Sequence, residues 1–206
     1  MTAEPLLLPI GHDLGARYAD GGAGHHQQVR AGIEVAELTR TEFTVWLLAH
    51  GIDDQDRPTR ASVVRTAERF GLDPDVAGKI VDQLLTDRLL AALDPDGDAA
   101  IEFAQRHQLV PLLIGLGPDP DQPWLQNIGL LNQPLVQVST AVYDVWSWAH
   151  LAPQLWAGCH DAAEVARNAG IESVEETQPR AVLAGILREV HGLLSSRAAY
   201  LDRRSN

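Results

Sequence analysis

A segment of the chain that occurs twice constrains the fold more than any other feature. The first copy is 38–51, LTRTEFTVWLLAHG, and the second is 138–151, VSTAVYDVWSWAHL, at a constant offset of 100 residues (138 minus 38). The residues that recur unchanged are Val45, Trp46, Ala49 and His50, as Val145, Trp146, Ala149 and His150. Self-similarity at a fixed spacing indicates that one structural unit is present twice.

The first copy carries the signals of an amphipathic helix. Thr39 is a suitable N-cap, and Glu42 three residues later can complete a capping box. The apolar stripe that follows at i, i+3, i+4 and i+7 consists of Phe43, Trp46, Leu47 and His50. In the second copy Ser139 takes the cap position, so a second helix of the same kind is expected there.

Strands are expected before the first of these helices. Alternation of apolar and polar residues predicts antiparallel strands over 27–30 and 33–38, around Gly32. A short apolar strand over 6–10 and a hairpin loop over 20–24 are predicted to precede them.

Two helices and a hairpin are expected after it. The second helix begins at Thr59 or Arg60 and the third follows Asp73 and Pro74, with Val76, Ile80 and Leu84 as its apolar stripe. The turn signal Asp96-Gly97 predicts a β-hairpin over 94–103, which would be the wing of a winged helix-turn-helix.

The second half repeats this order, with a strand over 135–138, a helix over 161–169 and a final helix over 178–201. The sequence therefore predicts a mainly α protein with small β-sheets (α+β), built from two tandem winged-helix-like units, 1–105 and 106–206. A single merged domain is the alternative.

Charge restricts the classes of partner. The net charge is −12, whereas a protein that grips nucleic acid over most of its surface needs clustered Lys and Arg. A transcriptional regulator with a local basic face remains an alternative, and the arginines that would contact DNA are Arg60, Arg65, Arg69, Arg180 and Arg188. No apolar run approaches the roughly 20 residues that a membrane-spanning helix needs. A single cysteine, Cys159, fits a reducing compartment, so a cytoplasmic location is expected.

Catalytic and metal-binding motifs are missing from the sequence. It has no G-x-S-x-G, H-E-x-x-H, phosphate-binding loop or dinucleotide fingerprint. Cys159-His160 lacks the paired spacing of a zinc site. We therefore expect a non-enzyme without cofactor or metal, with an accessory subunit of an enzyme complex as a further alternative.

The order of strands, the segment VAELTRTEFTVWLLAHG and the helix pair ending in QLLTDRLLAAL resembles a known family. This family is the peptide-recognition domains of ribosomally made peptide natural products, whose type member is the peptide chaperone of pyrroloquinoline quinone biosynthesis. The matching residues are Leu38, Thr41, Val45 or Trp46, and Gly51, and the resemblance covers about residues 6–93 and 109–201. The hairpin predicted over 94–103 and the duplication depart from the family pattern.

This resemblance implies that an extended leader peptide adds a strand to an exposed sheet edge near 28–35, with the third helix as the opposite wall. The implied peptide contacts are Gln28, Arg30, Ile33, Val35, Lys79 and Gln83. Trp146 and Trp148 cannot share one face of a helix, so the helix is expected to pack on two faces. This indicates either an additional interface through Trp148 and Trp156 or a core together with the junction between the two units. A peptide or protein partner is the leading hypothesis, and a homo-oligomer is left open.

Overall fold

The computed structural model describes residues 4–18, 25–52 and 56–204, so the hairpin loop predicted over 20–24 lies outside the described residues. The first half contains β1 (Leu6–Pro9), β2 (His12–Tyr18), β3 (His25–Ala31), β4 (Glu34–Leu38), α1 (Arg40–Leu48), α2 (Arg60–Arg69), α3 (Pro74–Thr86) and β5 (Leu90–Leu93). Strands β2, β3 and β4 form an antiparallel sheet in that order, and β1 pairs with β5. The strands predicted on either side of Gly32 are confirmed.

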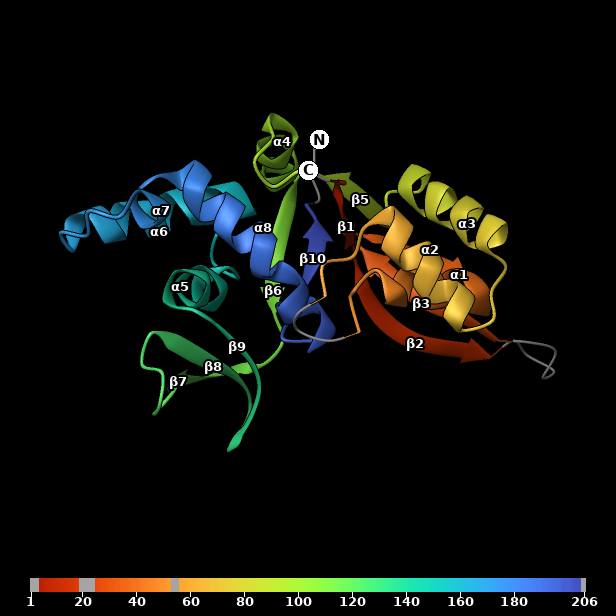
Figure 1. The fold of residues 1–206 in the computed structure, drawn as a ribbon, viewed down its shortest axis with the longest axis horizontal. Helices are drawn as coiled ribbons and strands as arrows, with labels where there is room; N and C mark the ends of the chain where they lie inside the picture. The colour runs from red at the N-terminus through yellow and green to blue at the C-terminus, as the bar shows by residue number, and fades with distance from the viewer. Residues whose placement is uncertain (1–3, 19–24, 53–55, 205–206) are drawn as a thin grey trace.

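The second half repeats the same order of elements (Figure 1). After α4 (Asp98–Arg106) come β6 (His107–Pro111), β7 (Ile114–Pro118), β8 (Leu125–Leu130), β9 (Gln133–Ser139), α5 (Thr140–Trp148), α6 (Leu155–Asn168), the short α7 (Val174–Thr177), α8 (Pro179–Ser195) and β10 (Ala199–Arg203). Strands β7, β8 and β9 form the second three-stranded sheet, and β6 pairs with β10. The chain is an α+β protein with an internal duplication.

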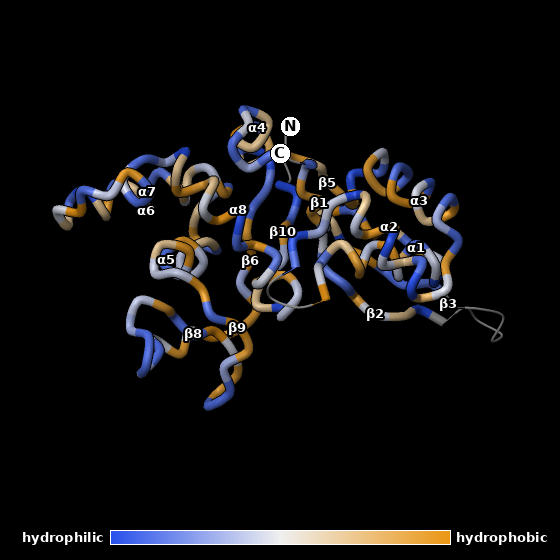
Figure 2. The backbone as a smooth tube through the Cα atoms, in the orientation of Figure 1, coloured by the Kyte–Doolittle hydropathy of each residue, from blue (hydrophilic) through white to orange (hydrophobic). Residues whose placement is uncertain are grey.

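Local capping explains where the helices of the first half begin. Thr39 accepts from the Glu42 amide at 3.3 Å, and Glu42 accepts from the Thr39 amide at 2.7 Å, which confirms the predicted capping box. Helix α2 begins at Arg60 with Thr59 as its cap, in line with the predicted start at Thr59 or Arg60, and Asp73 caps α3 with Pro74 in its first turn, as predicted. Hydrophobic and hydrophilic positions alternate along α3 (Figure 2), as a helix with one buried face requires.

A buried tryptophan makes an equivalent hydrogen bond to the backbone in each half. The indole N–H of Trp46 donates to the Leu89 carbonyl at 3.2 Å, and that of Trp146 donates to the Ala198 carbonyl at 3.1 Å. Each acceptor directly follows an arginine in the left-handed region, with φ of 59° at Arg88 and 56° at Arg197. The two tryptophan-bearing helices therefore occupy equivalent positions.

The halves meet along β1 and β10, which lie side by side (Figure 1). Ile10 forms a parallel bridge with Leu201, and the Gly11 amide donates to the Leu201 carbonyl at 2.7 Å. His191 on α8 is fully buried, and its Nε2–H donates to the Leu7 carbonyl at 2.9 Å. Strands from both halves thus share a backbone contact at the centre of the molecule.

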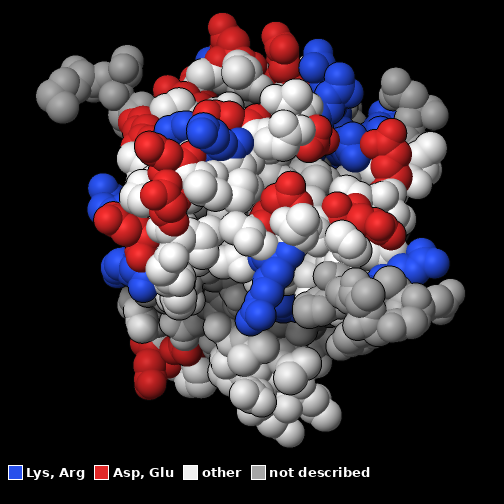
Figure 3. All heavy atoms as spheres, turned by 90° about the vertical axis from the view of Figure 1, so that its right-hand side faces the viewer, with Lys and Arg blue, Asp and Glu red and all other residues white. Residues whose placement is uncertain are grey.

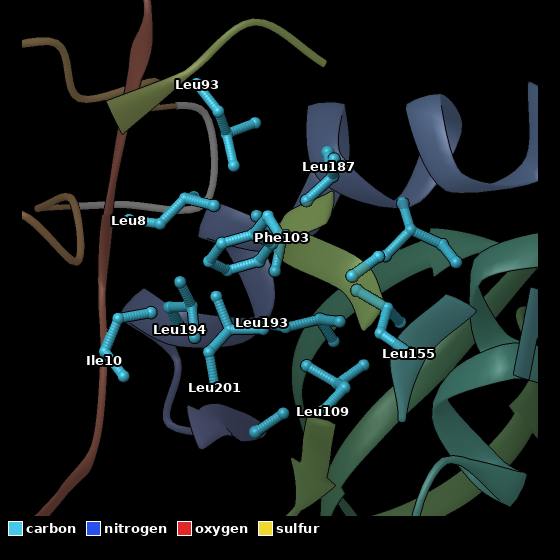
Figure 4. Packing of buried hydrophobic residues seen from close by; sticks show 14 of the residues in the cluster. Leu8, Ile10, Leu93, Phe103, Leu109, Leu155, Leu187, Leu193, Leu194 and Leu201 are labelled. Carbon is cyan, nitrogen blue, oxygen red and sulfur yellow. The ribbon is translucent and has the colours of Figure 1, made fainter. Parts of the chain in front are cut away.

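One hydrophobic core runs through both halves. Phe103 of α4 lies among leucines from each side of the junction, including Leu8 and Leu193 (Figure 4). Apolar burial stabilises by about 25 cal/mol per Å², so a continuous core of this kind couples the two halves energetically. Helix α4 also contacts α6 and α8, so it packs with the second half.

The hairpin predicted over 94–103 is wrong. Asp96 and Gly97 do form a turn, in which the Gly97 amide donates to the Asp94 carbonyl at 3.0 Å, but helix α4 follows it. The residues after the turn are strong helix formers, and Ala100, Phe103 and Ala104 are buried at helical spacing. The apolar run before the turn is β5, whose partner is β1 rather than a neighbouring wing strand.

Two further predictions for the long helices are corrected. The final helix was expected over 178–201, but α8 ends at Ser195, and left-handed Arg197 turns the chain into β10. The apolar stripe of α3 was assigned to Val76, Ile80 and Leu84. Its buried face instead consists of Ala77, Gly78, Val81 and Leu84, while Val76 is exposed.

Buried and partly buried histidines make stability depend on pH. The ring of His50 donates from Nδ1 to the Trp46 carbonyl at 3.1 Å, and burial lowers the pKa of His50 from 6.5 to about 4. Burial also lowers the pKa of His107 and of His191. These rings are neutral in the folded chain near neutral pH, and each takes up a proton on unfolding once the pH falls below about 6.5.

We expect the free energy of unfolding to fall as the pH drops from about 6.5 towards 4, because the unfolded state binds more protons. Replacing His50 by Gln should reduce this slope by about 1.4 kcal/mol per pH unit. Urea unfolding at a series of pH values measures this dependence of the free energy of unfolding on pH. A slope for His50→Gln equal to that of the unaltered protein would contradict the prediction.

Candidate functional site

Strand β4 forms one edge of the first three-stranded sheet and, within the described residues, pairs only with β3. A two-residue turn of Gly32 and Ile33 joins the two strands, with Gly32 at a φ of 63° that glycine adopts without strain. In such a hairpin Ala31 and Glu34 form the first hydrogen-bonded pair. The backbone N–H and C=O groups of Val35 and Glu37 therefore point away from β3, towards the open edge.

The two faces of β4 differ in character. Ala36 and Leu38 turn towards the core beside the buried Val29 of β3, whereas Val35 and Glu37 lie on the outer face. Val35 is 49% exposed and Ile33 in the turn is 86% exposed. The edge therefore offers unpaired backbone groups together with exposed apolar side chains.

Strand β9, the counterpart of β4, is less open to strand addition. It carries Pro134, which has no backbone N–H, and its register with β8 shifts between Ile128 and Gly129. Proline and β-bulges at an edge strand both hinder the pairing of a further strand. Of these two corresponding edge strands, β4 is therefore the more regular one.

The predicted peptide contacts are not all gathered at this edge. Gln28 and Arg30 lie on the central strand β3, and Gln28 donates to Glu37 at 3.1 Å. Lys79 and Gln83 are exposed on α3, where Gln83 donates to the Asp87 carboxylate at 2.9 and 3.0 Å. Helix α1 contacts both β4 and α3, so it forms the surface between the edge and that helix.

Arg30 belongs to the junction between the halves. Its guanidinium donates to Asp202 of β10 at 3.0 Å, to the Tyr200 hydroxyl at 2.7 Å and to the Gly32 carbonyl at 2.9 Å. Asp202 also accepts from the Gly32 amide at 2.6 Å. The structure therefore gives Arg30 a fixed structural role, which leaves it without a free guanidinium for a peptide.

A cavity of about 240 Å³ opens beside this junction, where Gly11, His12, Asp13, His50, Arg197 and Tyr200 are among the lining residues. Its polar groups interact mainly with one another: Arg197 lies 3.8 Å from the Asp13 carboxylate, and the His12 and Tyr200 rings are 4.7 Å apart. The Ser195 hydroxyl donates to the Gly192 carbonyl at 3.4 Å, and the Nδ1 of His50 is engaged with Trp46. This arrangement lacks the hydrogen bond from a nucleophile to a base that acyl transfer uses.

The remaining reactive groups are dispersed. Burial raises the pKa of the Cys159 thiol to about 12, which keeps it protonated, while the neighbouring His160 is exposed and packs edge-on against Trp156. Among residues 4–18, 25–52 and 56–204, no three His, Cys, Asp or Glu side chains converge as metal ligands.

The two tryptophans predicted at an interface differ in exposure. Trp148 at the end of α5 is 66% exposed, whereas Trp156 of α6 is partly buried against the core. Trp124, which the sequence left unassigned, is 65% exposed.

The arginines predicted for DNA contact are largely engaged within the protein. Arg60 is paired with Asp82 at 2.8 Å, Arg180 with Asp98 at 2.7 Å, and Arg188 with Asp96. Arg65 and Arg69 are exposed on α2.

Comparison of the chain with protein-family models, curated proteins and solved structures gave no match. Within the part of the chain that the structure describes, no helix is long and apolar enough to cross a membrane.

We expect Arg30 and Asp202 to be energetically coupled, because their ion pair joins the first sheet to β10 and the Asp202 side chain is only 12% exposed. A double-mutant cycle of Arg30→Gln and Asp202→Asn, measured by urea unfolding, should give a coupling of about 1–3 kcal/mol. The exposed pair of Arg60 and Asp82 provides the matched cycle, for which about 0.2–1 kcal/mol is expected. Equal couplings would show that the junction pair has no special role.

Proposed function

We propose that this chain is a non-catalytic recognition protein whose two winged-helix-like units serve as binding modules, and that the first unit binds an extended peptide. The observation that carries the proposal is the regular, unpaired edge of β4. Strand addition supplies affinity through backbone hydrogen bonds and specificity through alternate side chains. A leader peptide of a peptide-modification pathway is a ligand of this kind.

The surroundings of β4 favour this ligand. The exposed side chains of Val35 and Ile33 offer apolar contact to one side of an added strand. Helix α1, which contacts both β4 and α3, provides the surface on the other side of that strand. Lys79 is exposed on α3, the helix that we propose as the opposite wall, and would offer its amine to an acidic residue of the peptide. Gln28 and Glu37, already bonded to each other, lie on the outer face beside Val35.

DNA binding is the second candidate, supported by the exposed Arg65 and Arg69 of α2. Acidic and basic side chains are interspersed on the face of the first half that Figure 3 shows, without a continuous basic stripe. Together with the net charge of −12, this distribution favours a peptide over a phosphate backbone. A salt-dependent shift of duplex DNA in a gel, lost on Arg65→Ala and Arg69→Ala, would support the second candidate.

We expect Val35→Pro to weaken peptide binding about tenfold, the equivalent of one backbone hydrogen bond of about 1.4 kcal/mol. The substitution removes an outward-facing N–H without breaking the pairing of β4 with β3. Titration calorimetry with synthetic peptides that tile the short open reading frames beside the gene provides the measurement.

Val35→Thr is the matched control, because it alters the side chain but keeps the N–H, and its affinity should stay close to that of the unaltered protein. Hydrogen exchange should show slower exchange of the Val35 and Glu37 amides in the complex. If no tiled peptide binds, or if the Pro and Thr variants bind equally well, strand addition at β4 is refuted.

A further inference from the structure

A groove on the second half has no role in strand addition at β4. It has a volume of about 530 Å³ and lies between α5, α6 and the segment around α7. One stripe of each long helix lines it at helical spacing. The stripe of α5 consists of Ala141, Asp144, Val145 and Trp148, and that of α6 consists of Gly158, Asp161, Ala162, Val165 and Ala169.

Large apolar side chains line this groove yet remain exposed. Trp148 and Leu151 are each 66% exposed, Val165 is 67% exposed and Ile171 is 39% exposed. An amphipathic helix normally turns such residues inward, and the side of α5 away from the groove is already buried through Val142, Trp146 and, at the C-cap, Ala149. A contiguous apolar surface with a polar rim is typical of a site for a partner.

Three carboxylates lie on the groove, those of Asp144, Asp161 and Glu176, and no Lys or Arg is among its lining residues. Within the described residues none of the three takes part in an ion pair, and the neighbouring Arg167 donates to the Thr177 carbonyl instead. Burial in the groove, with a contribution from Glu176, raises the pKa of Asp144. The groove thus combines an apolar floor with uncompensated negative charge.

The backbone around the groove restricts the shape of its occupant. The walls are helices, whose backbone groups are already bonded internally, so they offer no edge to an extended chain. An occupant that covers the apolar floor must satisfy its own backbone hydrogen bonds, as a helix does. Helix-in-groove recognition uses apolar anchors at i, i+3, i+4 and i+7.

The corresponding surface of the first half differs in size and charge. Left-handed Gly71 and Gly170 end α2 and α6 equivalently, which aligns Ser62 with Asp161 and Thr66 with Val165. The first groove has about 320 Å³, and its charged lining residues are Arg57, Arg69 and one carboxylate, Asp56. Among the described residues, the equivalent groove therefore has an excess of positive charge in the first half, and three carboxylates without Lys or Arg in the second.

We infer that the groove between α5 and α6 binds an amphipathic helix of a partner protein, with apolar anchors against Trp148 and Val165 and Lys or Arg facing Asp144, Asp161 and Glu176. Opposite charge across such an interface raises the association rate and selects the partner. The basic groove of the first half would reject the same helix. This docking surface is separate from β4, so the chain can hold a peptide and a partner protein at once.

The test uses the full chain and an 18-residue model peptide with Leu at the i, i+3, i+4 and i+7 positions and Lys elsewhere. A Leu/Glu peptide with the same pattern and a scrambled Leu/Lys peptide are the comparison probes. We expect the helical Leu/Lys peptide to bind with a dissociation constant at least about tenfold lower than either, a difference of about 1.4 kcal/mol. Titration calorimetry and amide chemical shifts of α5 and α6 report binding.

Trp148→Ala should weaken binding about tenfold without changing the melting temperature, since the side chain is mostly exposed. Asp161→Lys should do the same through charge reversal. The matched control is Glu164→Lys, also exposed on α6 but outside the groove, which changes the net charge equally and should alter affinity less than about twofold.

If Asp161→Lys and Glu164→Lys weaken binding equally, the peptide is attracted by the net charge of the protein and not by the groove. That result would overturn the inference. Equal binding of the Leu/Lys and Leu/Glu peptides would do so as well. Sedimentation velocity supplies a further check: a dimer of the chain that Trp148→Ala dissociates would assign the groove to a second copy and refute a separate partner. Val35→Pro should leave binding of the helical peptide intact, which keeps this result distinguishable from failure at β4.

Discussion

The hydrogen bond from a buried indole to the carbonyl at the start of the last strand holds each half of this fold together. Trp46 and Trp146 fix β5 and β10 against α1 and α5, and these strands pair with β1 and β6. A single buried hydrogen bond contributes only about 1 kcal/mol net, but a carbonyl left buried without a donor costs about 1–3 kcal/mol. The two strands that meet at the junction belong to these pairs: Ile10, directly after β1, forms a parallel bridge with Leu201 of β10.

Local signals in the sequence were sufficient to predict the helices of the first half, because capping acts over three residues. Thr39 and Asp73 cap as expected, and α2 begins at Arg60, one of its two predicted starts. The partner of β5 and the whole of β10 were missed because the paired strands are distant in sequence: Leu6 pairs with Leu93, and His107 with Arg203. A short apolar run such as LAAL does not reveal which strand it joins, so the turn at Asp96-Gly97 suggested a wing instead.

The functional surfaces were predictable to a lesser extent. The spacing of Trp146 and Trp148 showed that one face of α5 cannot bury both, but only the structure shows that Trp148 is the exposed one. The role of Arg30 could not be inferred, because its partner Asp202 lies 172 residues away and belongs to the other half. Ile33 and Val35 were placed near an edge correctly, but only the strand order identifies β4 rather than β3 as that edge.

Comparison of the two halves distinguishes residues with the same structural role in both from residues that differ between them. The indole of Trp46 has the same bonded role in Trp146, whereas Thr66 and Ser62 on the neighbouring helix correspond to Val165 and Asp161. Changes of the second kind alter the chemistry of a surface at little cost to folding, because surface substitutions usually shift stability by less than about 0.5 kcal/mol. One copy could therefore keep a regular edge at β4 while the other, with Pro134 in its edge strand, acquired an acidic and apolar groove.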